Sequence, residues 1–323
     1  MPLVLRGIEF PRVFQMSGVT NFFGEGYPFH RVWKQVGMDW SGTTFVAKTT
    51  TLKAREGNMP RREDGLTPKE WKPRCIIVKP LKGVTLNAVG LSGPGLSALL
   101  DDGRWQKRIN PFWISFMSTA KNPKDRLQEL EDATEMLSVF KRDFIARIGL
   151  QVNYSCPNVG LDATKLVDEV QTALTVVARL DIPIMPKFDL RIFPKAIADI
   201  STHPTCDAVH LTNALPWGSF PSDINWKKLF GNDSSPLAKY GGGGLSGKPL
   251  LPLLIRWLVE ARSLIHKPIV AGGGILSPSN AERVITLGAD AIALGTIGIL
   301  RPWRMKETIH TAYKLYREEL PCE

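Results

Sequence analysis

Short apolar runs alternate with longer amphipathic segments along most of this 323-residue chain, and this alternation constrains its fold more than any other feature. Runs rich in β-branched residues indicate buried strands, and we expect eight of them, at 13–16, 43–47, 112–116, 149–152, 182–186, 208–211, 268–271 and 291–294. Apolar residues at helical spacing predict helices at 127–144, 166–180, 194–202, 250–265, 278–287 and 305–318. Eight strands with intervening helices predict an α/β fold, a single (β/α)8 TIM barrel that spans residues 1–323.

Two stretches are longer than the connections of a minimal barrel. Residues 52–110 contain a turn between strand-like runs, and residues 214–247 are rich in glycine, proline, serine and asparagine. Long excursions inside a compact domain are usually functional loops or lids. We therefore expect both stretches to be loop insertions at the C-terminal face of the barrel.

Polar or glycine residues come directly after the predicted strands. Barrel active sites occupy the carboxyl ends of the strands, so this placement predicts an active site there. The residues concerned are Ser17, Gly18, Lys48, Ser118, Asn153, Lys187, Thr212, Asn213, Gly272, Gly273, Gly274, Gly295 and Thr296.

Glycines cluster after the last two predicted strands. In barrels these two loops and the start of a short helix bind phosphate, because glycine lets backbone amides close on the anion. A third glycine-rich loop, 241–247, precedes a predicted helix. The alternative is that the glycines only allow tight turns. A phosphorylated cofactor fits this pattern better than a phosphorylated substrate.

The run from Asn153 to Asn158 follows an apolar segment and contains Cys156. Two amides that flank a thiol can bind a flat, amide-rich ligand while the sulfur acts as a base. The alternative is a turn that holds a small buried cysteine. The four cysteines form no CxxC pair, so neither a zinc site nor a disulfide framework is indicated.

The formal net charge of +10 would permit contact with nucleic acid or an anionic membrane. The basic residues are scattered, however, and the local concentration at 53–62 lacks an aromatic-studded RNA motif. We interpret it as solvated surface and expect no nucleic-acid partner. The apolar stretch at 289–300 is too short to cross a bilayer and the N-terminus lacks a secretory pattern, so we expect a cytoplasmic protein without membrane contact.

Taken in order, these motifs resemble the dihydroorotate dehydrogenase family of FMN-dependent barrels, in its soluble class with a cysteine base. The resemblance implies an oxidoreductase that converts dihydroorotate to orotate in pyrimidine biosynthesis. The matching segments are 48–52, 55–58, 87–91, 153–158, Lys187, Asn213, 243–249, 272–275 and 288–296.

The resemblance implies FMN as the cofactor. Lys187 would stabilise negative charge at the pyrimidine end of the reduced flavin. Ser17 and Gly18 would lie along the ring, which Lys48 and Asn153 would also contact. The FMN phosphate would be held by Gly247, Gly273, Gly274, Gly295 and Thr296.

The resemblance also implies the substrate contacts. Cys156 would take a proton from C5 of dihydroorotate while C6 delivers hydride to flavin N5, with Lys48 and Lys187 as further catalytic residues. Lys48 would place a positive charge near the substrate. The remaining substrate-binding residues would be Asn87, Val89, Gly90, Leu91, Asn153, Asn158 and Asn213.

Two departures from the family pattern fall in the substrate pocket. Ala214 stands where the family usually has serine or threonine, and the segment 159–164 is shorter than the usual lid. A related FMN oxidoreductase that acts on another dihydropyrimidine or cyclic amide is therefore an alternative. A flavin-binding or nucleic-acid-binding protein without redox turnover is a third reading, favoured only by the basic charge.

The electron acceptor stays open. No iron–sulfur ligand cluster is visible in the sequence, so fumarate or another soluble oxidant could accept the electrons, and a partner subunit with its own clusters is the alternative. The family resemblance alone implies a homodimer.

Overall fold

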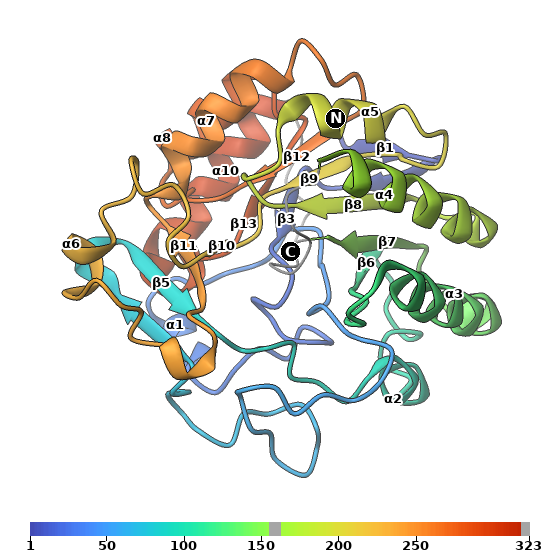
Figure 1. Ribbon diagram of the computed structural model, residues 1–323, viewed down its shortest axis with the longest axis horizontal. Helices are drawn as coiled ribbons and strands as arrows, with labels where there is room; N and C mark the ends of the chain where they lie inside the picture. Colours follow the sequence, from blue (N-terminus) through green and yellow to red (C-terminus); the bar gives the residue numbers. More distant parts are fainter. Residues whose placement is uncertain (155–162, 318–323) are drawn as a thin grey trace.

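The computed structural model describes residues 1–154 and 163–317. Its main sheet is parallel and has seven strands, and helices cover its outer side (Figure 1). In spatial order the strands are β3 (Val13–Gln15), β13 (Ala291–Leu294), β12 (Ile269–Gly272), β9 (Val209–Leu211), β8 (Ile184–Phe188), β7 (Ile148–Asn153) and β6 (Phe112–Phe116). The surrounding helices are α2 (Leu96–Asp101), α3 (Pro123–Phe140), α4 (Ala163–Val177), α5 (Pro194–Ser201), α7 (Leu250–Ala261), α8 (Pro278–Thr286) and α10 (Met305–Tyr316).

The segment predicted as the second strand, 43–47, makes isolated bridges instead of a strand. Thr44 bridges to Phe14 of β3, and Val46 bridges to Trp113 of β6. The ladder is interrupted at Lys48, whose amide donates to the carbonyl oxygen of Asn21 at 2.9 Å. This segment therefore links the two edges of a curled seven-stranded sheet, and the fold is α/β and resembles a TIM barrel.

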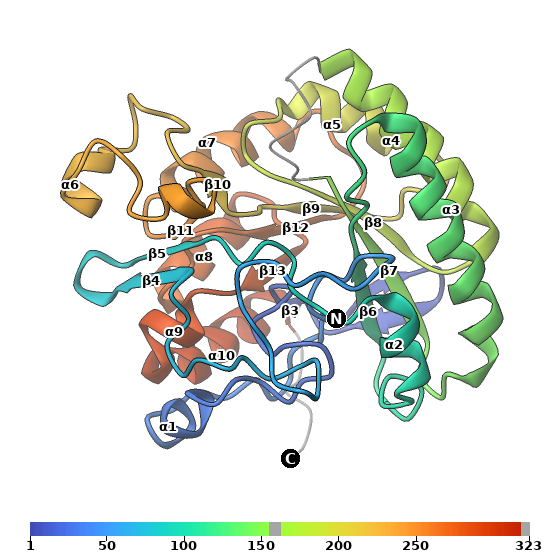
Figure 2. The same cartoon turned by 60° about the horizontal axis from the view of Figure 1, so that its bottom comes forward.

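The two long stretches contain a second sheet rather than loops alone. Strands from both stretches pair antiparallel in the order β10 (Leu215–Pro216), β11 (Gly244–Gly247), β5 (Val84–Asn87) and β4 (Ile76–Lys79). Figure 2 shows this sheet and α6 (Trp226–Phe230) on the opposite side of the molecule from α3 and α4. The sheet brings Asn87 and Gly244 into register.

Apolar side chains fill one end of the curled sheet. An N-terminal hairpin of β1 (Leu3–Leu5) and β2 (Ile8–Phe10) contributes Phe10, whose ring centroid lies 5.1 Å from that of Trp113. Phe14, Val46 and Met185 belong to the same buried cluster. This end is therefore closed by packing, which leaves the carboxyl ends of the strands for a site.

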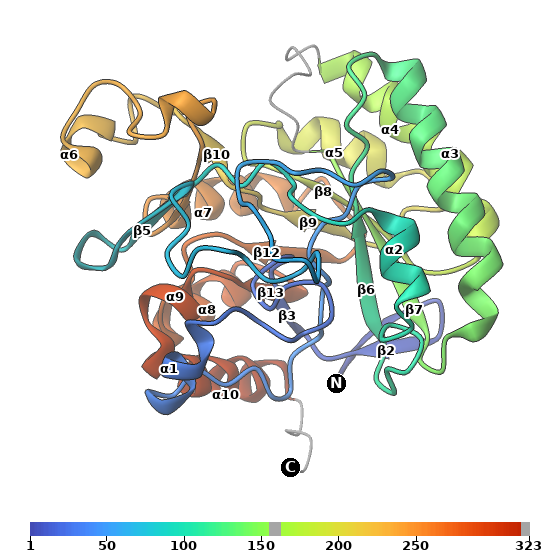
Figure 3. The same cartoon turned by 90° about the horizontal axis from the view of Figure 1, so that it is seen from below.

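The remaining short helices pack near the C-terminal helix. Figure 3 shows α1 (His30–Gln35) beside α9 (Ile297–Leu300) and α10. Among the helices that the structure describes, none combines the length and the apolar character needed to span a membrane.

Candidate active site

Lys187 is a buried cation at the centre of the candidate site. Its side chain is 1% exposed, and Nζ donates a hydrogen bond to Ser17 Oγ at 3.1 Å. Burial lowers the pKa of Lys187 to about 7. Lys187 lies within β8 rather than after it as predicted, because pairing with Asn153 of β7 and His210 of β9 continues the strand to Phe188.

Lys48 and Arg61 converge on one carbonyl oxygen. Lys48 Nζ donates to the Ser92 oxygen at 2.5 Å, and the Arg61 guanidinium binds the same atom. Both cations also lie over the ring of Phe22, at 4.7 and 5.0 Å from its centroid. Burial lowers the pKa of Lys48 well below its usual value, and the positive charge of Arg61 is a second, smaller cause. Two cations in this position suit an anionic ligand.

Arg61 was not predicted as a site residue. It lies in the basic run that we interpreted as solvated surface, yet it is half-buried and donates from Nε to Ser92 Oγ at 2.9 Å. The net charge of a sequence segment does not distinguish a buried cation from a solvated one.

Two of the predicted amides meet at neighbouring strand ends. Asn153 is the last residue of β7 and lies in register with Lys187 of β8. Asn213 follows β9, and its Nδ2 donates to Asn153 Oδ1 at 3.3 Å. Asn87 instead donates to the carbonyl oxygen of Gly244, at 3.4 Å, in the antiparallel sheet. The predicted Cys156 and Asn158 lie outside the described residues.

The predicted substrate loop 89–91 is a turn held by its neighbours. The backbone N–H of Asn58 donates to the carbonyl oxygen of Val89 at 2.9 Å. Gly90 and Leu91 both have positive φ, at 71° and 57°. A Cβ on Gly57 would lie 2.5 Å from the Val89 oxygen, so only glycine allows this approach. These contacts therefore join the turn to residues 57–58.

The predicted phosphate glycines form a corner where backbone segments approach closely. A Cβ on Gly274 would lie 2.7 Å from the amide nitrogen of Leu251 and 2.8 Å from the Gly247 oxygen. A Cβ on Gly273 would lie 2.6 Å from Thr212 Cγ2, and both glycines have positive φ. The start of α7 thus lies directly against the backbone of Gly274, and only glycine allows this approach.

The other predicted cofactor residues border the strand ends. A Cβ on Gly18 would lie 3.5 Å from Lys48 Cγ, and the Gly18 oxygen accepts from Tyr27 Oη at 2.7 Å. Gly295 follows β13, where a Cβ would lie 3.1 Å from Met16 Cβ, and Thr296 is the N-cap of α9. The structure thus groups these residues at the ends of β3 and β13.

Three interior polar residues, Ser115, Gln151 and His210, were also missed. All three are buried within strands, and Gln151 Nε2 lies 2.9 Å from His210 Nδ1. The sequence feature that could have identified them is a polar residue inside an otherwise apolar strand, such as Gln151 between Ile148 and Asn153.

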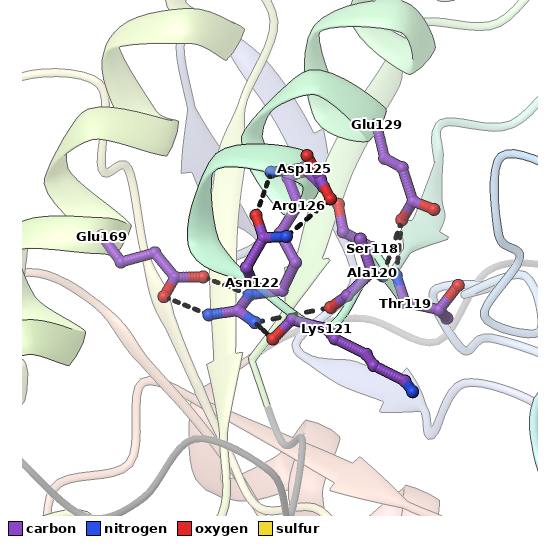
Figure 4. A network of polar contacts seen from close by, with 9 residues as sticks. All are labelled: Ser118, Thr119, Ala120, Lys121, Asn122, Asp125, Arg126, Glu129 and Glu169. Carbon is purple, nitrogen blue, oxygen red and sulfur yellow. Dashed lines mark hydrogen bonds and ion pairs between the residues drawn. The ribbon is translucent and has the colours of Figure 1, made fainter.

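An ion pair lies beside the end of β7. Figure 4 shows Arg126 of α3 reaching Glu169 of α4, with its Nε and Nη2 each 2.6 Å from a carboxylate oxygen. A cavity of about 30 Å³ next to this pair is bordered by Asn153 and Tyr154. Ser118, which we expected at the site, donates to the Arg126 carbonyl oxygen at 2.8 Å and so belongs to the start of α3.

Comparisons with known proteins identify relatives along most of the chain. Residues 22–314 match the family model described as dihydroorotate dehydrogenase. The chain is 27% identical over 298 residues to the dihydroorotate dehydrogenase B (NAD(+)) catalytic subunit of Desulforudis audaxviator. The aligned region covers 90% of this chain and 83% of that protein. It is 25% identical over 324 residues to the protein of the same name from Petrotoga mobilis, which covers 98% of this chain and 94% of that protein.

A solved structure is similar along nearly the whole chain. Dihydroorotate dehydrogenase from Eimeria tenella, solved in complex with ferulenol, superposes with a TM-score of 0.65 and 19% identity, and covers 97% of this chain and 84% of that one. This likeness shows the fold. The family model extends over most of the chain, and the chain therefore belongs to the dihydroorotate dehydrogenase family.

Proposed function

We propose that the protein is an FMN-dependent dihydroorotate dehydrogenase, which oxidises dihydroorotate to orotate in pyrimidine biosynthesis. One observation carries the proposal: the buried ammonium of Lys187 lies in register with Asn153, which accepts a hydrogen bond from Asn213. A cation and paired amides at adjacent strand ends suit a reduced flavin and a ligand rich in amide groups.

The residues present fit FMN. Gly247, Gly273 and Gly274 bring backbone segments together next to the N-terminus of α7, a position typical of phosphate sites in barrels. Gly295 and Thr296 would complete the phosphate site, while Ser17, Gly18 and Lys48 would lie along the ring. The bound flavin supplies the hydride acceptor, and Lys187 stabilises negative charge at the ring.

The substrate would lie between the amides and the buried cations. Asn87, Asn153, Asn158 and Asn213 would bind the imide-like edges, and a pocket of this kind rejects ligands that leave its polar groups unpaired. The pair of Lys48 and Arg61 would bind the carboxylate, because both cations already converge on one oxygen. Cys156 would accept the proton from C5.

Ala214 supports the alternative of another dihydropyrimidine or cyclic amide. A Cβ on Gly244 would lie 2.8 Å from the Ala214 Cβ, so this side of the pocket is lined by small residues and lacks a hydroxyl. A panel of dihydropyrimidines that includes dihydrouracil would decide between the substrates. The alternative requires faster flavin reduction by one of these than by dihydroorotate.

We also propose a partner subunit that receives the electrons. The relatives described above are named catalytic subunits of NAD(+) enzymes, which supports such a partner. Fumarate or another soluble oxidant is the alternative. If fumarate reoxidises the reduced, purified chain within one turnover time, no partner is needed. A homodimer, a cytoplasmic location and a closed eight-stranded barrel within one domain complete the proposal.

Identification of the chromophore tests the cofactor assignment. The purified protein should be yellow and release FMN, identified by its mass, on denaturation. Orotate should perturb the visible spectrum of the bound flavin. Release of no flavin, or of FAD alone, would contradict the assignment.

A further inference from the structure

Tyr154 lies directly after β7, on the opposite face of the sheet from the candidate site. Asn153 and Lys187 are partners in the register of β7 and β8. Side chains alternate between the two faces of a strand, so the next residues, Tyr154 and Phe188, point away from this inner pair. Their rings stack, with centroids 5.8 Å apart and an interplanar angle of 18°. The Tyr154 N–H also donates to the Lys187 carbonyl oxygen at 2.9 Å, so Tyr154 joins the two strand ends.

The hydroxyl of Tyr154 is a buried polar group without a protein partner. Tyr154 as a whole is half-buried, but its Oη is buried and has no hydrogen-bond partner among the described residues. Burial raises the pKa of Tyr154, and the negative charge of Glu169 is a second, smaller cause. The hydroxyl therefore keeps its proton near neutral pH. A buried hydroxyl that makes no hydrogen bond destabilises a protein, because it has lost its contacts with water.

A cavity with polar groups in its wall lies beside Tyr154. Its volume is about 30 Å³, and its lining includes Tyr154, Ser118, Arg126 and Glu169. A buried water molecule needs about 10 to 15 Å³ of space and two to four polar partners. The cavity meets both requirements, so it suits a bound water molecule better than a larger solute.

The carboxylate of Glu169 can accept a further hydrogen bond in this cavity. Arg126 Nε and Nη2 bind one carboxylate oxygen each, both at 2.6 Å. Each oxygen of a carboxylate can accept two hydrogen bonds, so the ion pair leaves Glu169 with acceptor capacity. Ser118 Oγ donates its proton to the Arg126 carbonyl oxygen at 2.8 Å and keeps its own lone pairs as acceptors. Figure 4 shows Ser118, Arg126 and Glu169 close together.

We infer that one bound water molecule links the Tyr154 hydroxyl to the Glu169 carboxylate, and that Tyr154 is a positioning residue for the strand end at Asn153. The water accepts from Tyr154 and donates to Glu169. The ion pair between α3 and α4 thereby fixes the Tyr154 ring, and the ring fixes the end of β7. The water does not depend on the reaction, whereas the effect on substrate rests on the proposed function, in which Asn153 binds it.

The sign of a stability change tests the water. Tyr154→Phe removes the hydroxyl and keeps the ring that stacks on Phe188. If a water holds the hydroxyl, the variant loses a hydrogen bond, and its unfolding equilibrium constant should rise about fivefold. If the hydroxyl has no partner, the same change removes an unpaired polar group, and the constant should stay the same or fall. Urea unfolding of the flavin-free protein measures the difference.

Tyr316→Phe is the matched reference variant. Tyr316 is also half-buried, and its Oη donates directly to the Ala289 carbonyl oxygen at 3.0 Å. Loss of this direct bond should raise the unfolding constant by a similar factor. The two variants should therefore change stability in the same direction and by similar amounts.

A second substitution at Glu169 tests whether the water connects the two residues. Glu169→Gln retains the shape of the side chain and removes the charge that strengthens a hydrogen bond. In the Glu169→Gln background, Tyr154→Phe should raise the unfolding constant less than it does in the wild type. Tyr316→Phe should have the same effect in both backgrounds, because distant sites are additive. Equal effects of Tyr154→Phe in the two backgrounds would remove the link to Glu169.

A crystal structure locates the water directly. An ordered water should lie about 2.5 to 3.0 Å from Tyr154 Oη and from one carboxylate oxygen of Glu169. A direct bond between Tyr154 Oη and a protein atom, or a cavity without electron density for a water, would overturn the inference.

Binding of orotate tests the positioning role. Tyr154→Phe should raise the dissociation constant of orotate severalfold and leave the flavin content unchanged, because Asn153 loses the support behind it. Tyr316→Phe should bind orotate like the wild type despite a comparable loss of stability, which separates positioning from general destabilisation. Identical orotate titrations of the two variants would overturn the positioning role. A protein that binds no flavin would contradict the proposed function instead, and the unfolding data and crystal structure would still decide the water.

Discussion

The ammonium of Lys187 lies 3.1 Å from the hydroxyl of Ser17, although 170 positions separate the two residues in the chain. This contact spans the interior of the curled sheet, from β8 to the loop after β3. Ser17 is neutral, so this hydrogen bond leaves the positive charge of Lys187 without compensation by a carboxylate. Such a charge suits a ligand that becomes negative during the reaction.

Replacement of Lys187 by methionine should stabilise the flavin-free protein at pH 7. Burial lowers the pKa of Lys187 to about 7 from its usual 10.5, so the unfolded chain binds the proton more tightly. The penalty to the wild type is complete at or below pH 7 and disappears as the pH rises to about 10.5. The advantage of Lys187→Met should be on the order of a few kcal/mol at pH 7, because a tenfold change in proton binding corresponds to about 1.4 kcal/mol.

Urea unfolding at about pH 6, 8 and 10 measures this difference. Lys195→Met is the matched control, because the Lys195 side chain is 71% exposed. Curves for wild type and Lys187→Met that stay parallel across this range would show that the buried lysine does not titrate as described.

Gly273→Asp should abolish flavin binding. The aspartate would place a side chain and a negative charge beside Gly247 and Gly274, and its Cβ would lie 2.6 Å from Thr212 Cγ2. Gly218→Asp is the control, because Gly218 also has positive φ but has no atom within 4 Å of a Cβ. The absorbance ratio of flavin to protein measures occupancy. A fully yellow Gly273→Asp protein would place the phosphate elsewhere.

Asn213→Ala should weaken orotate binding and leave the flavin in place. The change removes the donor to Asn153 Oδ1 and, under the proposed function, a direct ligand contact. One buried polar contact typically contributes about 0.5 to 1.5 kcal/mol, so the dissociation constant should rise severalfold. Asn225→Ala, which removes an α6 cap, is the control. Identical orotate titrations of the two variants by flavin absorbance would locate the pocket elsewhere.

Cys156→Ala should slow flavin reduction by dihydroorotate by about 10² to 10⁴, because the proton at C5 would lose its base. Cys156→Ser should also be impaired, since a hydroxyl is far less acidic than a thiol. The wild-type rate should climb with pH through the thiol titration, near 8.5 in an unperturbed cysteine.

Two other cysteines provide the controls. Burial raises the pKa of Cys75, and it raises that of Cys206 to about 12, so neither thiol is a base near neutral pH. Cys75→Ala and Cys206→Ala should therefore reduce their flavin at the wild-type rate in anaerobic stopped-flow measurements. A Cys156→Ala protein that does so as well would remove Cys156 from the mechanism.

The main sheet was predictable from sequence because its strands are continuous apolar runs. The run at 112–116 coincides with β6, and 291–294 coincides with β13. The antiparallel sheet was not predicted. β10 has two residues and pairs with β11, whose sequence is Gly-Leu-Ser-Gly and which pairs with β5. Tertiary pairing rather than local propensity therefore creates these two strands.

The proximity of Asn153 and Asn213 was predictable, because each follows or ends an apolar strand of one parallel sheet. Arg61 was missed because burial of one cation within a basic run depends on tertiary contacts with Phe22 and Ser92. His210 was missed because a single polar residue in an apolar strand does not identify its partner, which lies 59 positions away in Gln151.

Anaerobic titration of the purified protein with dihydroorotate tests the central claim most directly, because it needs no electron acceptor. The account predicts that the visible absorbance of the bound flavin bleaches and that about one orotate forms for each flavin reduced. The contrary result is a flavin that dithionite bleaches but that dihydroorotate leaves oxidised. This result would contradict the account whether or not the protein binds orotate.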